Sequence, residues 1–277
     1  MSTAIAASER DLDYIRELVE SRSAIVLEQD KDYLVNARLT PVAECNGLSS
    51  ISELVSRLRG SHYGQLHAQV VEAMTTNETS FFRDVAPFDA LREVVLPFIQ
   101  EQRAITRTMK IWCAACSSGQ EPYSVGISLR EVLPDVDSWM VSIHCTDLSQ
   151  KMVDRTNAGK YSQLEVNRGL PAPFILKYFQ KKGMKYVARD EIRRLVKAQT
   201  MNLIEPWPPF GPFDVIFLRN VLIYFNTDIK AKILERAQRA LRPGGFLFLG
   251  GAETTLGICD AFERVPRAKA SLYRLRS

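Results

Sequence analysis

The chain has 277 residues, of which 46% are hydrophobic and 25% charged, and its formal net charge is +4. This composition is that of an ordinary globular protein, and the length allows one or two domains. The small positive excess without a long basic block argues against a nucleic-acid partner, and no apolar run reaches the roughly 18 residues of a membrane span.

The amino-terminal segment MSTAIAASERDLDY lacks a basic region followed by an apolar core, so we expect no signal peptide. A cytoplasmic protein with reduced thiols is therefore predicted. Cys113 and Cys116 form a C-x-x-C pair in an apolar, strand-like stretch, without the second pair of a structural zinc site. We expect packed thiols here and no metal site.

Helical patterns open the chain. Apolar residues recur at helical spacing after Ser8, which is followed at Asp11 by a capping signal. Similar patterns occupy 30–47, 49–60 and 63–76. Short helices with short connections predict a small helical domain that ends at about residue 76.

The rest of the chain alternates between strand and helix patterns. Strand-like runs lie in 108–116, 139–147, 213–225, 242–251 and 270–276, and helical runs lie in 87–102, 121–133, 149–159 and 228–241. Alternation of this kind predicts an α/β fold with a mostly parallel, doubly wound, Rossmann-like sheet. Two strand-like runs around the ARDE stretch predict a small antiparallel β-subdomain at about 178–200, which leads back into the main sheet.

Polar residues follow the predicted strands, where ligands of open α/β sheets bind. Gly119 lets the backbone approach a ligand, and Asp147 after the second strand is typical of an acid that accepts ribose hydroxyl groups. A G-x-G-x-x-G phosphate cradle is missing, which argues against a dinucleotide. The pattern favours an adenosine ligand without phosphates, such as S-adenosylmethionine, and hence a class I methyltransferase.

Four stretches in order, TTNETSFFRD, IWCAACSSGQEPYS, FDVIFLRNVLIYF and LRPGGFLFLGGAET, resemble the CheR family of chemotaxis-receptor methyltransferases. The resemblance covers nearly the whole chain. It implies an S-adenosylmethionine-dependent protein-glutamate O-methyltransferase with S-adenosylhomocysteine as product. It also implies a helical domain at 1–76, a linker over the cofactor at 77–94, and a methyltransferase domain at 95–277 that contains the β-subdomain.

The same resemblance assigns site residues. Those matching cofactor-binding positions are Asn77, Thr79, Arg83, Glu121, Asp147, Asn202, Leu203, Asn220 and Val221. Tyr224 matches a tyrosine close to the transferred methyl group, and Arg83 and Tyr224 are the predicted catalytic residues. A glutamate substrate is already ionised at pH 7, so the reaction needs no general base. Arg83 would orient a carboxylate, and Tyr224 would donate a hydrogen bond or shape the methyl pocket.

Structural roles are open alternatives for several of these residues. Arg83 would pair at a surface with Asp84 or Glu78, and Asp147 would cap the helix that follows it. The neighbouring aromatic residues Phe81 and Phe82 are expected in the core rather than against a ligand.

The resemblance implies that the partner is the cytoplasmic helical bundle of a chemoreceptor. Two features of this sequence depart from the family pattern and affect docking to the receptor. The second helix carries only Lys31 and Arg38 against several acids, and the β-subdomain is too short for the insertion that grips a receptor's C-terminal pentapeptide, so we expect no such tether. Alternatives are a sensor of S-adenosylmethionine or S-adenosylhomocysteine without turnover, and a methyltransferase of the same fold acting on another carboxylate.

Overall fold

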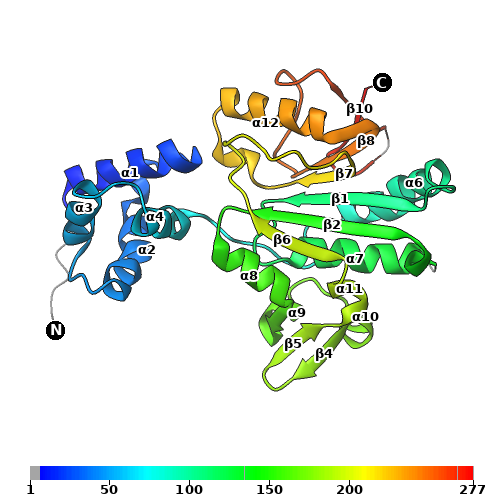
Figure 1. The fold of residues 1–277 in the computed structure, drawn as a ribbon, viewed down its shortest axis with the longest axis horizontal. Coiled ribbons are helices and arrows are strands. Elements are labelled where there is room, and N and C mark those ends of the chain that lie inside the picture. Colours follow the sequence, from blue (N-terminus) through cyan, green and yellow to red (C-terminus); the bar gives the residue numbers. More distant parts are fainter. Residues whose placement is uncertain (1–6, 134, 267, 277) are drawn as a thin grey trace. The chain divides into compact units, whose positions relative to one another are not determined.

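Figure 1 shows the computed structural model of the chain, which describes residues 7–133, 135–266 and 268–276. These residues form two compact units. The first unit comprises the described residues up to Thr76 together with Tyr224–Asn226, and the second comprises Asn77–Ile223 and the described residues from Thr227 onward. No helix among the described residues is long and apolar enough to cross a membrane.

The amino-terminal unit is helical, as the apolar periodicity predicted. Within residues 7–76 its elements are α1 (Glu9–Ser23), η1 (Gln29–Lys31, a 3-10 turn), α2 (Asp32–Cys45), α3 (Ile51–Arg59) and α4 (Gln65–Met74). Ser8 caps α1, because its side chain accepts a hydrogen bond from the backbone N–H of Asp11. One apolar face of each helix is buried in a shared core that includes Ile15, Leu39 and Leu54.

Arg38 ties α2 to the end of α4. Its Nη1 donates hydrogen bonds to the carbonyl oxygens of Met74 at 2.8 Å and Thr75 at 3.1 Å. A cation at the C-terminal end of a helix is favourable, because the last carbonyl groups there lack partners in the helix. Arg38 is the one basic residue of α2, since Lys31 lies in η1, and it therefore has a structural role inside this unit.

The larger unit is built on a mixed seven-stranded sheet with the order β6-β2-β1-β7-β8-β10-β9. The first five strands in this order run parallel, and β10 is antiparallel to both β8 and β9. The predicted doubly wound, mostly parallel sheet is confirmed. The strands are β1 (Thr108–Ala114), β2 (Met140–Asp147), β6 (Val196–Thr200), β7 (Phe213–Leu218), β8 (Leu241–Leu249), β9 (Phe262–Arg264) and β10 (Leu272–Leu275).

Helices connect these strands in the predicted places. They are α5 (Ala86–Ala90), the π-helical η2 (Leu91–Val95), α6 (Leu96–Gln102), α7 (Gln120–Val132), α8 (Gln150–Ala158) and α12 (Thr227–Ala240), with short 3-10 turns η3 (Val136–Ser138) and η4 (Leu222–Tyr224). Aromatic rings fill much of the core between helices and sheet. Phe217 stacks on Phe248 with centroids 4.4 Å apart, and Phe88 lies 6.3 Å from Phe217.

The β-subdomain differs from its predicted bounds of about 178–200. Its three-stranded antiparallel sheet has the order β3-β5-β4, and 196–200 instead pairs in parallel with β2 in the main sheet as β6. The hairpin turns at Gly183, not at the ARDE stretch, which begins a helical turn. The elements are β3 (Lys160–Ser162), α9 (Gln163–Asn167), α10 (Ala172–Tyr178), β4 (Phe179–Lys182), β5 (Lys185–Ala188) and α11 (Asp190–Arg193).

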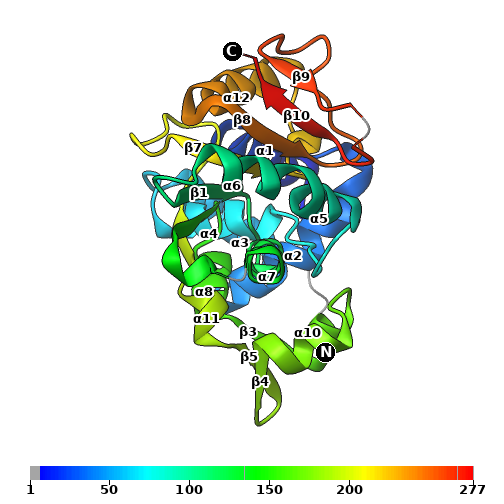
Figure 2. The ribbon, with the colours of Figure 1, turned by 90° about the vertical axis from the view of Figure 1, so that its right-hand side faces the viewer.

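Both ribbon views show the β4–β5 hairpin at the opposite end of this unit from β10, and Figure 2 shows β9 beside β10 (Figures 1 and 2). The hairpin therefore projects from the unit, while β6 returns the chain to the edge of the main sheet beside β2. The subdomain is thus an insertion between β2 and β6 that leaves the parallel order of the sheet intact.

Cys113 and Cys116 are packed thiols, as expected. Cys113, Cys116 and Cys145 are buried and unbridged. Burial raises the pKa of Cys113 to about 11, because the charged thiolate loses its hydration. Within the described ranges, no group of three or more His, Cys, Asp and Glu side chains is arranged to hold a metal ion.

Candidate active site

The carboxyl ends of β1, β2, β6 and β7 lie at one edge of the sheet, because these strands are parallel neighbours. The segments that leave this edge contain most of the residues predicted for the site. The first of them, after β1, adopts positive φ at Ala115 (53°), Ser117 (49°) and Gly119 (94°). Two of these are non-glycine residues, so the surrounding structure holds the loop in an uncommon conformation.

Asp147 ends β2 and is buried. Its Oδ2 accepts a hydrogen bond from the Ser117 backbone N–H at 2.8 Å, and its Oδ1 accepts one from the Ser149 N–H at 3.0 Å. The N-cap of α8 is Ser149, whose side chain accepts from Met152, and not Asp147 itself. Asp147 therefore joins the loop after β1 to the start of α8, and the capping alternative does not hold.

Ser117 also connects this edge to the linker. Its hydroxyl group donates to the backbone carbonyl oxygen of Asn77 at 2.8 Å. Further along the linker, the Phe82 N–H donates to the Ser124 hydroxyl on α7 at 2.9 Å. Phe81 is fully buried and Phe82 nearly so, which confirms that both belong to the core.

A shallow pocket of about 280 Å³ lies beside this linker. Asn77, Thr79 and Ser118 line it together with side chains of α7, α8 and α9. Asn77 and Thr79 therefore lie near the loop after β1.

Arg83 is half-buried, and its Nη1 donates to the backbone carbonyl oxygen of Glu78 at 3.0 Å. The surface ion pair considered for Arg83 does not form. The Asp84 carboxylate pairs instead with Arg219 at 2.8 Å, and the Glu78 carboxylate pairs with Arg168. Among the described residues, Arg83 has no carboxylate partner in an ion pair, so its guanidinium keeps donor groups for an anion.

Arg219 follows β7 and is 1% exposed at its side chain. Its Nη1 donates to Glu121 at 2.8 Å, and its Nη2 donates to Asp84 at 2.8 Å and to the carbonyl oxygen of Arg83 at 3.1 Å. Burial raises the pKa of Glu121 above its ordinary value, and Arg219 opposes that rise. This guanidinium therefore joins the linker, the start of α7 and the end of β7.

Glu253 organises the turn after β7. Its buried carboxylate accepts hydrogen bonds from the backbone N–H groups of Asn220 and Val221, both at 2.9 Å, Leu222 at 2.7 Å and Gly250 at 2.6 Å. Asn220 has a φ of 57°, a left-handed conformation that this carboxylate stabilises. Asn220 and Val221 are thus held at the sheet edge through their backbone.

Asn202 and Leu203 follow β6, next to Asp147. The Met201 N–H donates to the carbonyl oxygen of Asp147 at 2.9 Å, which fixes this segment against the end of β2. Asn202 accepts the Ile204 N–H on Oδ1 at 3.2 Å, and the buried Leu203 accepts the Trp207 indole N–H on its carbonyl oxygen at 3.0 Å.

The larger unit thus brings together nine of the ten predicted site residues at one edge of the sheet. Tyr224 lies outside this set. It is half-buried at the end of η4, and residues 224–226 group with the amino-terminal unit. Sequence reasoning did not select Arg219, Glu253 and Ser117, although all three lie within the quoted motifs, because only tertiary contacts reveal what they join.

The chemistry of this edge suits S-adenosylmethionine. Glu121 lies at the start of α7, where a nucleotide-binding fold would receive phosphate, and Asp147 lies at the end of β2, where such a fold receives ribose hydroxyl groups. Carboxylates here disfavour a phosphate anion and suit a ligand with ribose hydroxyl groups and a cationic sulfonium group. The fold and this site define a class I S-adenosylmethionine-dependent methyltransferase.

Comparisons with known proteins specify the family. Residues 77–270 match the CheR methyltransferase, SAM binding domain, and residues 10–75 match the CheR methyltransferase, all-alpha domain. The chain therefore belongs to the CheR family of chemotaxis protein methyltransferases, which are S-adenosylmethionine-dependent protein-glutamate methyltransferases.

Individual relatives are similar over their full lengths. The chain is 39% identical to chemotaxis protein methyltransferase 1 of Pseudomonas aeruginosa, over 98% of this chain and 100% of that protein. It is 40% identical to chemotaxis protein methyltransferase 1 of Vibrio cholerae, over 99% of this chain and 100% of that protein. The chemotaxis protein methyltransferase Cher2 of Pseudomonas putida is 38% identical, over 96% of this chain and 98% of that protein.

Proposed function

We propose that this protein methylates glutamate side chains in the cytoplasmic helical bundle of a chemoreceptor, with its cofactor at the carboxyl edge of the sheet. The observation that carries the proposed site is the set of bonds made by Ser117. One residue donates its N–H to Asp147 and its hydroxyl group to the Asn77 carbonyl, so linker, first loop and acid are fixed together.

Each predicted residue has a proposed role at this site. Asp147 accepts the ribose hydroxyl groups, and Asn202 with Leu203 lies at the adenine side. Asn220 and Val221, held by Glu253, line the edge after β7. Asn77, Thr79 and Glu121 complete the binding set from the linker and the start of α7.

Catalysis would depend on positioning, since bound S-adenosylmethionine supplies an electrophilic methyl group and the substrate carboxylate is already ionised at neutral pH. Arg83 would orient a carboxylate, because its guanidinium is held at the Glu78 carbonyl without an ion pair to a described acid. Tyr224 would donate a hydrogen bond or shape the space around the methyl group, as the family resemblance implies.

Methyl transfer from labelled S-adenosylmethionine to chemoreceptor-containing membranes tests this function. We expect label on the receptor band that is released by mild base, because a glutamate methyl ester is hydrolysed under conditions that leave N-methyl groups intact. Arg83→Ala should lose the label, whereas Arg264→Ala, which removes an exposed arginine of β9, should keep it. Cofactor binding without label on any receptor would support a sensor, and base-stable label would contradict carboxyl methylation.

We also propose that this protein has no strong tether to a receptor's C-terminal pentapeptide. The support is the short β4–β5 hairpin, in which only Gly183 and Met184 connect Lys182 to Lys185. Titration of the full chain with a peptide copying the receptor tail should give no saturable binding. Binding at micromolar concentrations would contradict the proposal.

A further inference from the structure

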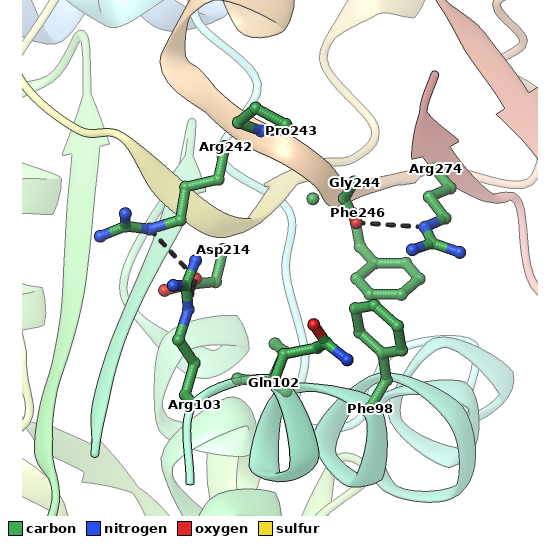
Figure 3. A pocket seen from close by; sticks show the side chains of 11 residues that line it. Phe98, Gln102, Arg103, Asp214, Arg242, Pro243, Gly244, Phe246 and Arg274 are labelled. Atoms are coloured by element: carbon green, nitrogen blue, oxygen red, sulfur yellow. Dashed lines mark hydrogen bonds and ion pairs between the residues drawn. The ribbon is translucent and has the colours of Figure 1, made fainter. Parts of the chain in front are cut away.

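A second pocket lies at the opposite edge of the main sheet from the candidate active site. It has a volume of about 210 Å³ and is bounded by the end of α6, the starts of β7 and β8, and a residue of β10 (Figure 3). These strand starts face away from the carboxyl ends that carry Asp147 and Asn220, because β7 and β8 run parallel to β1. The proposed methyl transfer uses no residue of this pocket.

Arginine dominates the lining. Arg103 comes from the residue after α6, Arg242 from the start of β8 and Arg274 from β10, and Asp214 is the one acid among the lining residues. The local formal charge is therefore that of three guanidinium groups against one carboxylate. Elements distant in the sequence bring these cations together, although like charges at close range repel each other.

Asp214 cannot neutralise this charge. Its Oδ1 lies 3.3 Å from Arg103 Nε and 3.2 Å from Arg242 Nε, and its Oδ2 accepts the Lys110 backbone N–H at 2.8 Å. The buried Arg242 Nε makes no hydrogen bond in the described structure despite this ion pair. The single carboxylate is thus shared between two arginines.

Arg274 is positioned by two aromatic rings and a carbonyl group. Its guanidinium carbon lies 4.6 Å from the ring centroid of Phe98 and 5.9 Å from that of Phe246, and its Nε donates to the Gly244 carbonyl oxygen at 3.3 Å. Among the described residues no carboxylate forms an ion pair with it, and its two terminal nitrogens have no hydrogen-bond acceptor. Figure 3 shows this side chain beside the two rings and Gly244. A guanidinium held in place by rings and a carbonyl group keeps donors for an external anion.

We propose that this pocket binds a phosphate group, either as inorganic phosphate or as the phosphate of a small ester such as a nucleotide. Guanidinium groups recognise phosphate through paired, charge-assisted hydrogen bonds, and three of them supply more donors than a carboxylate ligand would use. Phe98 and Phe246 already contact each other, with centroids 5.4 Å apart, as well as Arg274. These contacts leave little ring surface on which a nucleotide base could stack. We therefore infer that the pocket recognises the phosphate group of such a ligand.

Calorimetric titration of the full chain with inorganic phosphate tests the site. S-adenosylhomocysteine should be saturating throughout, so that the adenosine site is filled. We expect Arg274→Gln to weaken phosphate binding by about tenfold or more, because it removes a guanidinium group that forms no ion pair with a described carboxylate. Arg276→Gln is the matched control, since it removes an exposed arginine two residues further along. Arg103→Gln is a second variant that leaves the stack of Arg274 on Phe98 intact and serves if Arg274→Gln does not fold.

The titrations separate the possible sources of the phosphate. Tighter binding of a nucleoside monophosphate than of inorganic phosphate would identify an ester, and equal binding would identify the free ion. The proposal is overturned if neither probe binds the unmodified protein at millimolar concentration, or if Arg276→Gln weakens binding as much as Arg274→Gln does. It is independent of the proposed methylation, because binding is measured without a receptor.

Discussion

Two buried charged side chains, Glu253 and Arg219, stabilise the conformation of the candidate active site. Glu253 accepts four backbone N–H groups at 2.9 Å or less, from the turn after β7 and from Gly250, and Arg219 joins two acids and a carbonyl group. Buried charges are costly unless they are paired, and both of these are bonded to backbone or to opposite charge, although the Nε of Arg219 makes no hydrogen bond in the described structure. Glu253 and Arg219 therefore fix the conformation of residues 219–223.

Glu253→Gln should destabilise the protein and weaken cofactor binding. The amide keeps one acceptor oxygen but turns its own N–H₂ donor toward backbone donors, so at least one buried N–H loses its partner. We expect a loss of about 1–3 kcal/mol in the free energy of unfolding. Urea denaturation measures this loss, and calorimetry with S-adenosylhomocysteine should show affinity reduced about tenfold.

Glu263→Gln is the control, because Glu263 is exposed on β9 and the substitution removes the same charge. Equal stability and equal cofactor affinity of the two variants would contradict the role assigned to Glu253.

Thiol reactivity should follow burial at each cysteine. Cys45 is exposed, whereas Cys113 is buried and has its pKa raised to about 11. Since the thiolate is the reactive form, a disulfide reagent at mildly alkaline pH should modify Cys45 rapidly and leave Cys113, Cys116 and Cys145 intact until denaturant is added. Rapid modification of the folded Cys45→Ser/Cys259→Ser double variant would contradict this packing.

Helix caps could be predicted from local sequence, whereas the pairing of the strands could not. The capping of α1 by Ser8 and of α3 by Ser50 could be read from neighbouring residues, because cap and helix lie within one turn. The strand pairing of the β-subdomain could not be predicted in this way. Lys160 pairs with Val187, 27 positions further along. The composition of 196–200 fits a strand of either sheet, and only its pairing with β2 assigns it to the main sheet.

A capping box between β3 and α9 makes the stability of this subdomain depend on pH. Burial opposes ionisation of Glu165, but hydrogen bonds from the N–H and hydroxyl group of Ser162 and from Arg155 lower its pKa below the ordinary 4.5. Because the pKa of this carboxyl group is lower in the folded state, its ionisation stabilises the protein at pH values above the unfolded-state pKa. This stability is lost as the pH falls through the folded-state pKa. Glu165→Gln should therefore destabilise the protein at pH 7 and converge on the unmodified protein in acid.

Thermal unfolding between neutral and acid pH measures this difference. Glu235→Gln on the exposed face of α12 is the control and should differ little from the unmodified protein at any pH. A deficit of Glu165→Gln that stays constant down to pH values well below 4.5 would show that the carboxylate charge is irrelevant to the cap.

At the scale of the whole molecule, the alternation of strands and helices was sufficient to predict the class of fold, and the four motifs were sufficient for the family. The positions of Asp147 and Asn220 also followed from sequence, because strand ends in a parallel sheet meet at one edge. The arginine pocket was not predicted. Arg103, Arg242 and Arg274 lie in three separate elements, and only the folded sheet brings them together.

The function proposed for this protein is transfer of a methyl group to a glutamate carboxylate of a chemoreceptor. Its most direct test is mass spectrometry of peptides from a purified receptor, after incubation with this protein and S-adenosylmethionine. We expect methyl esters on glutamate side chains of the cytoplasmic helical bundle, which are absent with Arg83→Ala and present with Arg264→Ala. Methylation confined to other side chains, or an unmodified receptor when the protein demonstrably binds S-adenosylmethionine, would contradict it.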